Sequence, residues 1–465
     1  MPAVGRYHSP VKAPVRVVIL VANPITYDGR VRRHATTLVE AGYDVCVIGV
    51  VGPNDRADPP TQRSDDGSRS ADAMGAVAVP AQAGWRWRRI DRRRTGLGPR
   101  LRWLASASRQ RLAQASFALL QAAAGDSAGF TGAWLAQLSG LSVATSAPDL
   151  AWAALQERPQ LIYANDLDTL PAACWAAQLA RVGFVYDAHE VYVDEHPDLG
   201  STTRRVRACA EAYFSRRAKA VLTVNELIAR DLQGRYDLPN PTVVRNLPQL
   251  DDNDAAHIPS PDQRSLGDPG TLHLLYQGAH IGLSQHGVDD MLRAVARLRQ
   301  PGPGQLQLRL TLRGGLSVDE DRRLRQRCQA LGIVPQVDLV APVPGAEALV
   351  HAALRDGADV GLAVHPPLCL SYVYTTSSKV YEYQLAGLAV VASDVTGNRH
   401  SVGPDAGVFY PAGDDARLAD VLRELSWDRR KLRRLQQAAY LHGKRNLRWQ
   451  DERLRLLDVI RQSLA

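Results

Sequence analysis

Short apolar runs alternate with amphipathic stretches along most of the chain. Residues 15–22 form a nearly continuous run of apolar side chains, which is typical of a strand buried on both faces of a parallel sheet. Residues 30–41 then repeat apolar side chains at helical spacing, and residues 44–51 form a second apolar run. This strand-helix-strand opening predicts an α/β fold with parallel sheets.

The same alternation resumes after residue 155 and continues to the end of the chain. It predicts strands at 161–164, 184–186, 220–224, 242–245, 272–277, 306–313, 337–340, 360–364 and 388–392. It predicts helices at 169–181, 203–217, 226–233, 288–298, 318–331, 346–354, 416–425, 429–445 and 450–463. Ligands of such folds bind outside the carboxyl ends of the strands, so polar residues at those ends are the candidates for chemistry.

Three stretches interrupt this alternation. Residues 1–14 predict a flexible tail. Residues 52–155 begin as a loop rich in Pro, Asp, Ser and Gly and continue as an Arg-rich and Ala-rich sequence, which predicts a loop followed by a basic helical insertion. Residues 251–270 are polar, contain three prolines and predict a linker. The expected domains are therefore 15–250 and 271–445, followed by a closing helical segment at 446–465.

Composition sets limits on location and chemistry. The 465 residues are 45% hydrophobic, which suits two or three domains with large cores. The five cysteines form no Cys-x-x-Cys pair, and most lie in apolar patterns, which favours reduced cysteines over a disulfide framework. No apolar run approaches the length of a membrane span, and the first residues lack the apolar core of a signal peptide. We therefore expect a cytoplasmic protein.

The positive charge is concentrated in one segment. The net charge is +8, and arginines interleaved with tryptophans gather between Trp85 and Arg111. Such a segment suits the surface of an anionic membrane, which predicts a peripheral contact with its inner face. The alternative is a helical insertion that is solvated or packs on its own domain. No nucleic-acid-binding motif accompanies the charge, so nucleic acid is not an expected partner.

The junction at 375–387 carries the strongest chemical signal. Hydroxyl residues stand where a helix N-cap belongs, and Lys379 follows in the first turn, where the positive end of the helix dipole disfavours a cation. An anion beside the free backbone N–H groups would remove that conflict. Glu382 shares a helix face with Lys379, and Gly387 ends the helix. A phosphate at Lys379 and ribose hydroxyls at Glu382 would suit a nucleotide. The alternative is an ordinary helix with an ion pair.

Polar residues also follow the strands of the first half. Gly29 permits a close approach of backbone to ligand, and Arg30 could meet an anion or an acceptor. The alternative there is a helix capped by Asp28 with solvated arginines. Asp166 follows the strand at 161–164 and is a candidate for a ligand contact. His189 follows the next strand and could bond a sugar hydroxyl or position a reacting group, although a lone histidine is more often structural.

The second half repeats this arrangement. Gly278 closes the strand at 272–277 and would allow backbone N–H groups to approach a diphosphate. Arg313 and Gly314 occupy the same position after the next strand. Val343 lies in a turn that could present backbone atoms to a base. Each signal is weak by itself, and the shared position at strand ends gives the set its weight.

Taken together, these segments make the chain similar to the retaining glycosyltransferases of the GT-B fold, of the family-four (group 1) type. The segments that carry the similarity are 28–33, 165–170 with 187–190, 276–278, and 378–383 with 386–388. The resemblance implies two Rossmann-like, doubly wound domains that face each other across a cleft. The N-terminal domain would receive the acceptor, the C-terminal domain would bind the donor, and the last helix would cross back to the N-terminal domain.

The resemblance also implies roles for single residues. His189 would contact the donor sugar, Lys379 the diphosphate and Glu382 the ribose, and these are the expected catalytic residues. The other expected substrate-binding residues are Gly29, Arg30, Asp166, Gly278, His286, Arg313, Gly314, Val343, Tyr374, Ser378 and Val380. Members of this fold need no bound metal ion. No cofactor is expected either, because the nucleotide-diphosphate sugar, of the UDP or GDP type, is a substrate. The expected acceptor is a glycan, a lipid-linked glycan or a secondary metabolite, and the expected transfer retains the anomeric configuration.

Two departures from the family pattern bear on the chemistry. Tyr374 stands where a sugar-binding glutamate is usual, and the loop after residue 278 has His280 and His286 where two cations are usual. Losing one charge-assisted phosphate contact costs roughly 1.5–3 kcal/mol. The cations that could replace it are Lys379, Arg313 and Arg399. The alternative to a transferase is a non-catalytic or epimerase-like relative that binds a nucleotide sugar.

Overall fold

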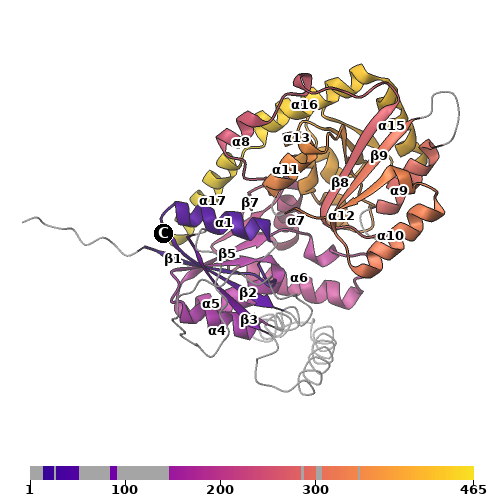
Figure 1. Ribbon diagram of the computed structural model, residues 1–465. Coiled ribbons are helices and arrows are strands. Elements are labelled where there is room, and N and C mark those ends of the chain that lie inside the picture. Colours follow the sequence, from indigo (N-terminus) through magenta and orange to yellow (C-terminus); the bar gives the residue numbers. More distant parts are fainter. Residues whose placement is uncertain are drawn as a thin grey trace, which may run out of the picture. The chain divides into compact units, whose positions relative to one another are not determined.

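The computed structural model describes residues 14–25, 28–51, 84–91, 146–283, 287–299, 306–343 and 346–465. Its contacts divide the chain into two units. The first unit consists of Met1–Asp187, Cys209–Val221 and Leu457–Ala465, and the second of Ala188–Ala208 and Leu222–Leu456. Two parallel sheets with helices between successive strands form the framework (Figure 1). The predicted α/β class is therefore confirmed.

The first sheet has seven strands in the order β3-β2-β1-β4-β5-β6-β7. The strands are β1 (Arg16–Leu20), β2 (Asp44–Val51), β3 (Arg86–Asp91), β4 (Leu161–Asn165), β5 (Gly183–Ala188), β6 (Ala220–Thr223) and β7 (Thr242–Val243). Residues 17–20 and 161–164 in the two central strands are fully buried, which explains why they read as continuous apolar runs. The strand order reverses between β1 and β4, so the loops after these strands diverge at that point.

Helices cover both faces of this sheet. They are α1 (Gly29–Glu40), α4 (Ala147–Gln156), α5 (Asp166–Ala180), α6 (Ser201–Ser215) and α7 (Glu226–Tyr236). In the first unit α1 lies on one face, and α4 and α5 pack together on the other (Figure 1). Helix α5 begins at Asp166, earlier than the predicted residue 169. Asp166 has a φ of 65°, and the Thr169 hydroxyl donates to the Asn165 carbonyl at 2.5 Å.

Residues 86–91 correct one prediction, because they form a strand and not part of a helical insertion. Strand β3 pairs in parallel with β2 at the end of the sheet. Arg86 binds Glu157 at 3.0 Å, and Arg88 binds Gln156 at 2.6 Å. These partners are distant in sequence, so the local pattern of arginines and tryptophans could not reveal them. The remainder of the basic segment, 92–111, lies outside the described residues.

The second sheet has six strands in the order β10-β9-β8-β11-β12-β13. They are β8 (Thr271–His280), β9 (Gln307–Gly315), β10 (Val337–Val340), β11 (Val360–Ala363), β12 (Ala389–Ser393) and β13 (Gly407–Tyr410). The described pairings are parallel, so the carboxyl ends of these strands share one edge of the sheet. The order reverses between β8 and β11, where doubly wound sheets bind their ligands.

The helices of the second unit cover its sheet on both faces. The helices after residue 250 are α8 (Asp252–His257), α9 (Val288–Leu298), α10 (Val318–Ala330), α11 (Ala346–Arg355), α12 (Leu370–Tyr374), α13 (Ser378–Leu385), α14 (Thr396–Ser401), α15 (Asp415–Trp427), α16 (Arg429–Asn446) and α17 (Trp449–Leu464). Helix α17 belongs to the first unit from Leu457 onward. Helices α9 and α15 pack together on one face, and α11 and α13 on the other (Figure 1). None of the described helices is long and apolar enough to cross a membrane.

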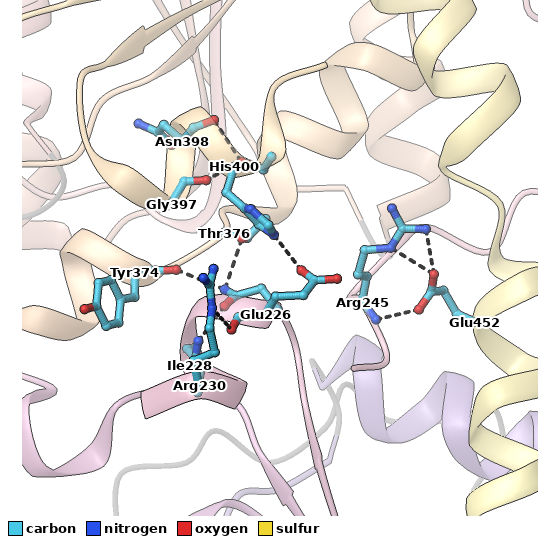
Figure 2. Close-up of polar contacts among 12 residues, drawn as sticks. Glu226, Ile228, Arg230, Arg245, Tyr374, Thr376, Gly397, Asn398, His400 and Glu452 are labelled. Atoms are coloured by element: carbon cyan, nitrogen blue, oxygen red, sulfur yellow. Dashed lines mark hydrogen bonds and ion pairs between the residues drawn. The ribbon is translucent and has the colours of Figure 1, made fainter. Parts of the chain in front are cut away.

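The start of α17 is fixed to the chain after β7 by a buried ion pair. Glu452 is fully buried and accepts hydrogen bonds from the backbone N–H of Arg245 at 2.8 Å and from its Nη2 at 2.7 Å (Figure 2). Arg245 also donates to the Asn446 carbonyl at the end of α16 at 2.9 Å. Because the Glu452 carboxylate is buried, breaking this pair would leave an uncompensated charge inside the protein. The pair therefore holds the start of α17 in one position.

Candidate functional site

The junction at 375–387 has the local structure that the sequence predicts. Ser377 is the N-cap of α13, and Gly387 follows the helix with a φ of 63°. The Ser377 hydroxyl makes no capping hydrogen bond, so it does not serve the free amides of the first turn. Ser378 and Val380, both expected to contact a substrate, lie in this first turn. The first turn therefore has no side-chain cap beside Lys379, although the Val380 N–H donates to the Ser377 carbonyl at 3.0 Å.

Side chains of α13 meet the end of β8. Lys379 Nζ lies 5.2 Å from the centre of the Tyr276 ring. Glu382 is 2% exposed and accepts a hydrogen bond of 2.7 Å from Gln277 Nε2. The backbone N–H of Gln277 donates to the Tyr383 hydroxyl at 3.2 Å. The alternative of a solvated surface ion pair does not fit a carboxylate that is buried against β8.

The ammonium group of Lys379 lies where its positive charge is disfavoured. Burial lowers the pKa of Lys379, and the negative charge of Glu382 opposes that shift without cancelling it. The positive end of the α13 dipole disfavours the cation further. An anion at the first-turn amides would offset both effects, because it would interact with the ammonium group and with the helix end together. An anionic group would therefore suit this arrangement better than water alone.

Buried polar atoms without a partner mark the same edge of the sheet. Tyr276 Oη, Gln277 Oε1 and Arg313 Nε have no hydrogen bond to any residue that the structure describes. Gln277 and Arg313 are direct partners in the β8–β9 register. Buried polar groups nearly always have a partner, from the protein or from water. A partner for these buried atoms would have to come from an ordered water or from a ligand atom.

Two of the cations considered as replacements for the usual loop cations already have carboxylate partners. Arg313 is 5% exposed and forms an ion pair with Asp356. Arg399 binds Asp394 at 2.6 Å at the surface. Their charges are balanced within the protein, which leaves Lys379 as the candidate for an anion.

The glycines at the strand ends have a packing role. A side chain on Gly314 would place its Cβ 2.6 Å from the Gly278 carbonyl oxygen, because β8 carries an irregularity between Gln277 and His280. The structure therefore brings Gly278 and Gly314 together, as predicted for one strand edge. Val343 lies after β10 on this edge and is partly buried. His286 lies outside the described residues.

The segment that leads into α13 is held from two sides (Figure 2). Asn225, the N-cap of α7, is 1% exposed. Its Nδ2 donates to the Tyr374 carbonyl at 2.9 Å and to Thr376 Oγ1 at 3.1 Å. On the other side, a Cβ on Gly397 would lie 2.1 Å from the Thr375 carbonyl oxygen, so α14 packs directly on this backbone. The Tyr374 ring points away from these contacts (Figure 2).

Helices α7 and α14 are also joined to each other. Glu226 follows Asn225 and lies 2.5 Å from His400 Nε2 on α14 (Figure 2). The hydrogen bond from His400 helps to lower the pKa of Glu226, although burial acts in the opposite direction. The two helices therefore form a clamp, defined by Asn225, Glu226, Gly397 and His400, around residues 374–376.

The run after β5 belongs to the second unit and contacts the same segment. His189 is partly buried, and its backbone N–H donates to the Tyr192 hydroxyl at 3.3 Å. Glu190 Oε2 accepts from Ser371 Oγ at 2.5 Å and from Thr375 Oγ1 at 2.9 Å. Burial raises the pKa of Glu190, and these two hydrogen bonds oppose the shift. His189 thus lies in the same unit as Lys379 and Glu382, next to a carboxylate bound to the segment before α13.

The candidates of the first unit surround a buried ion pair. Asp28 caps α1 as the alternative interpretation predicts, because its Oδ1 accepts from the Val31 N–H at 3.0 Å. Arg30 is 4% exposed and binds Asp187 through two hydrogen bonds of 2.9 and 2.7 Å. Burial lowers the pKa of Arg30, but the charge and hydrogen bonds of Asp187 outweigh it and raise that pKa. The Tyr163 hydroxyl donates to the same carboxylate at 2.8 Å. The guanidinium is therefore engaged in the core.

The remaining candidates of this unit lie at the starts of helices. Gly29 is the first residue of α1, and Asp166 is the first residue of α5 and is partly exposed. Within the described ranges, no group of three or more His, Cys, Asp or Glu side chains could hold a metal ion.

Sequence reasoning missed three residues that organise the sites. Gln277 lies in the segment 276–278 that carries the family resemblance, and its polar side chain at the end of a buried strand is a usable signal. Asn225 stands directly before a predicted helix, which indicates an N-cap, but its hydrogen bonds to residues 374 and 376 have no local signal. Asp187 begins the segment 187–190, and its pairing with Arg30 depends on a contact between distant segments.

Two family models match the chain. Residues 28–246 match the glycosyl transferase 4-like domain, and residues 271–428 match the glycosyl transferases group 1 domain. Together these matches cover most of the chain. No curated protein sequence matches it.

Several solved structures are similar to the chain along nearly its whole length. A glycosyltransferase from Rickettsia africae has a TM-score of 0.61 at 12% identity, covering 97% of this chain and 99% of its own. The Anabaena protein HepE, in complex with UDP and glucose, has a TM-score of 0.60 at 14% identity, covering 96% and 99%. Sucrose-phosphate synthase of Thermosynechococcus elongatus has a TM-score of 0.62 at 16% identity, covering 96% and 98%. At such identities the likeness shows the fold, and it confirms the predicted two-domain α/β fold of the GT-B class.

Replacing Lys379 by methionine should stabilise the ligand-free protein at neutral pH. The pKa of Lys379 is lower in the folded chain than its ordinary value of 10.5, so below the folded pKa the protein carries a buried charge that reduces its stability. We expect Lys379→Met to raise the melting temperature by roughly 1–3 °C at pH 7. The gain should shrink as pH rises from the folded pKa toward 10.5, because the wild-type side chain then becomes neutral in the folded protein.

Lys444→Met is the matched control for this measurement. Lys444 Nζ lies 5.7 Å from the centre of the Tyr440 ring, but the residue is exposed, so its melting temperature should equal that of the wild type. A Lys379→Met protein that melts at or below the wild-type temperature at pH 7 would contradict the buried charge.

Replacing Asn225 by alanine should cost more than the loss of a helix cap. The change removes the α7 cap and both hydrogen bonds to the segment before α13, so we expect the free energy of unfolding to fall by about 2–4 kcal/mol. Asp414→Ala removes a simple exposed cap, that of α15, and should cost about 1 kcal/mol. Denaturant unfolding measures both values. Equal losses in the two variants would show that the clamp contributes no stability.

Proposed function

The chain belongs to the glycosyl transferases of group 1, and from this premise we propose that it transfers a sugar from a nucleotide-diphosphate sugar to an acceptor hydroxyl. The transfer retains the anomeric configuration and uses no resident metal ion. The observation that carries the proposal is the position of Lys379 and Glu382 on α13 against the end of β8. A cation, uncapped amides and a buried carboxylate at one strand edge suit a phosphate group and a ribose.

The donor is a nucleotide sugar, with UDP as the first candidate for its nucleotide. The similar Anabaena protein was crystallised with UDP and glucose, and also with UDP-glucose, which supports this choice. Glu382 accepts hydrogen bonds from the ribose hydroxyls, Lys379 contacts the diphosphate, and the Gly278 amide contacts a phosphate oxygen. His189 contacts the sugar. A GDP-type donor is the second candidate.

The chain's own contribution to the reaction is positioning and charge stabilisation. The bond between the anomeric carbon and the phosphate oxygen breaks as the acceptor oxygen bonds to that carbon on the same face of the sugar. The acceptor proton passes to the departing phosphate oxygen. Lys379 and the first-turn amides of α13 stabilise the charge that develops on the diphosphate, and they need no reorganisation to do so because β8 and the clamp hold them in place.

Nucleotide binding tests this proposal. In calorimetry the wild type should bind UDP or GDP, and Glu382→Ala should weaken that binding by about 10- to 100-fold, because it removes a charged acceptor from a buried site. Glu424→Ala, which removes an exposed carboxylate paired with Lys431, should leave the affinity unchanged. Absence of binding by every nucleotide diphosphate, or equal binding by Glu382→Ala, would contradict the proposal.

Product release separates transfer from the alternatives of a non-catalytic protein or an epimerase. A transferase should release the free nucleotide diphosphate from its sugar nucleotide when an acceptor is added, at the same rate with EDTA present. Release without dependence on the acceptor, or conversion of the sugar with no release, would favour the alternatives.

The acceptor is a glycan, a lipid-linked glycan or a secondary metabolite, and the protein acts in the cytoplasm. A lipid-linked acceptor fits a contact between the basic segment, 85–111, and an anionic membrane. Arg86 and Arg88 are already bound within the sheet, so the attraction depends on the arginines after residue 91. Co-sedimentation with liposomes should increase with anionic lipid and decrease with salt. Binding that is indifferent to lipid charge would remove this contact from the proposal.

A further inference from the structure

We propose that Glu190 is a second carboxylate of the donor site and accepts a hydrogen bond from a hydroxyl of the transferred sugar. This role rests on the proposed function, because it requires a sugar nucleotide bound at Lys379 and Glu382. Glu190 follows His189, the residue expected to contact the sugar. Glu190, which follows β5 in the sequence, would thereby determine which sugar the site accepts.

The hydrogen bonds of Glu190 leave one of its oxygens available. Ser371 Oγ and Thr375 Oγ1 both donate to Oε2, at 2.5 and 2.9 Å. Oε1 accepts no hydrogen bond from the residues that the structure describes. A carboxylate has about four acceptor sites on its two oxygens. The two hydroxyls therefore orient the group and leave Oε1 for a donor that comes from outside the protein.

The position of this carboxylate is fixed relative to the segment before α13. Ser371 and Thr375 lie on either side of Tyr374 in the sequence, and α13 begins at Ser378. The clamp and the Glu190 contacts hold this segment, so the carboxylate lies beside the backbone that leads to the uncapped helix end. All of these residues belong to the second unit.

The sequence itself shows why a carboxylate from elsewhere is useful here. Residues 360–381, from β11 to the middle of α13, contain no Asp or Glu, and Tyr374 brings a phenol where a sugar would need a charged acceptor. Carboxylates are strong acceptors for sugar hydroxyls because the bond is charge-assisted. Glu190 supplies that charge from a different segment of the chain.

The pKa of Glu190 is raised on balance, and its hydrogen-bond donors oppose that shift. Burial raises its pKa and the negative charge of Glu195 adds to that shift, whereas the hydrogen bonds from Ser371 and Thr375 and the proximity of His189 lower it. These donors favour the ionised form. A sugar hydroxyl at Oε1 would favour it further.

A purely structural role is the competing explanation, and the chain offers a control for it. Asp194 Oδ2 accepts from the Leu370 N–H at 2.7 Å, so Asp194 also connects this run to α12. Asp194 also has an arginine partner, Arg204, and we assign it no contact with the donor. If Glu190 merely connects the two segments, replacing Asp194 should have the same effect as replacing Glu190.

Calorimetry on the full chain distinguishes these roles. The probes are free UDP and whichever of UDP-glucose, UDP-galactose and UDP-N-acetylglucosamine the wild type binds most tightly. We expect Glu190→Gln to bind UDP within about twofold of the wild type and the sugar nucleotide about 10-fold or more weakly, because a charge-assisted bond to the sugar is lost. Asp194→Asn should leave both affinities unchanged.

Deoxy analogues of the chosen sugar nucleotide identify the contact itself. For the analogue that lacks the hydroxyl bound by Glu190, the wild type and Glu190→Gln should bind equally. The inference is overturned if Glu190→Gln weakens UDP and the sugar nucleotide by the same factor, if it changes neither, or if Asp194→Asn reproduces its effect. A wild type that binds neither UDP nor any sugar nucleotide contradicts the proposed function itself, and with it the role of Glu190.

Discussion

The partly buried charge of Lys379 at the amino end of α13 is the constraint on which the second unit's site depends. Burial, the helix dipole and the adjacent Tyr276 ring fix an ammonium group where the protein alone balances it incompletely. The negative charge of Glu382 favours the charged form of Lys379, but the Glu382 carboxylate also accepts a hydrogen bond from Gln277. An anionic ligand bound here would offset that cost, so the feature that weakens the ligand-free protein would also contribute to the binding energy of the ligand.

The rest of the second unit keeps this helix end in place. Gln277 and Tyr383 connect α13 to β8, which lies beside the reversal of strand order. Asn225 and Gly397 hold the preceding backbone from opposite sides, and Glu190 binds two of its hydroxyls. Transfer catalysis by positioning needs such rigidity, because a small displacement of the diphosphate contact would reduce the stabilisation of the leaving group. The clamp therefore supports the site by holding the backbone before α13 in place, and we assign its residues no catalytic role.

The sequence was informative where local pattern decides structure. The buried runs at 17–20 and 161–164, the N-cap at Ser377 and the helix end at Gly387 follow from periodicity and backbone preference, and the structure confirms them. The short elements α12, α14 and β13 escaped prediction because four to six residues show no clear period. The strand at 86–91 escaped because its arginines resemble a solvated helix face until Glu157 and Gln156 are placed beside them. Asn225 and Glu190 act on residues almost 150 or more positions away, which no local signal encodes.

A crystal structure of the full chain with its sugar nucleotide would show whether Lys379 and Glu382 hold the donor. We expect the diphosphate beside Lys379 Nζ and the first-turn amides of α13, with a ribose hydroxyl within hydrogen-bond distance of the Glu382 carboxylate. A nucleotide bound at any other place in the second unit, with Lys379 and Glu382 left without contact to it, would contradict the account.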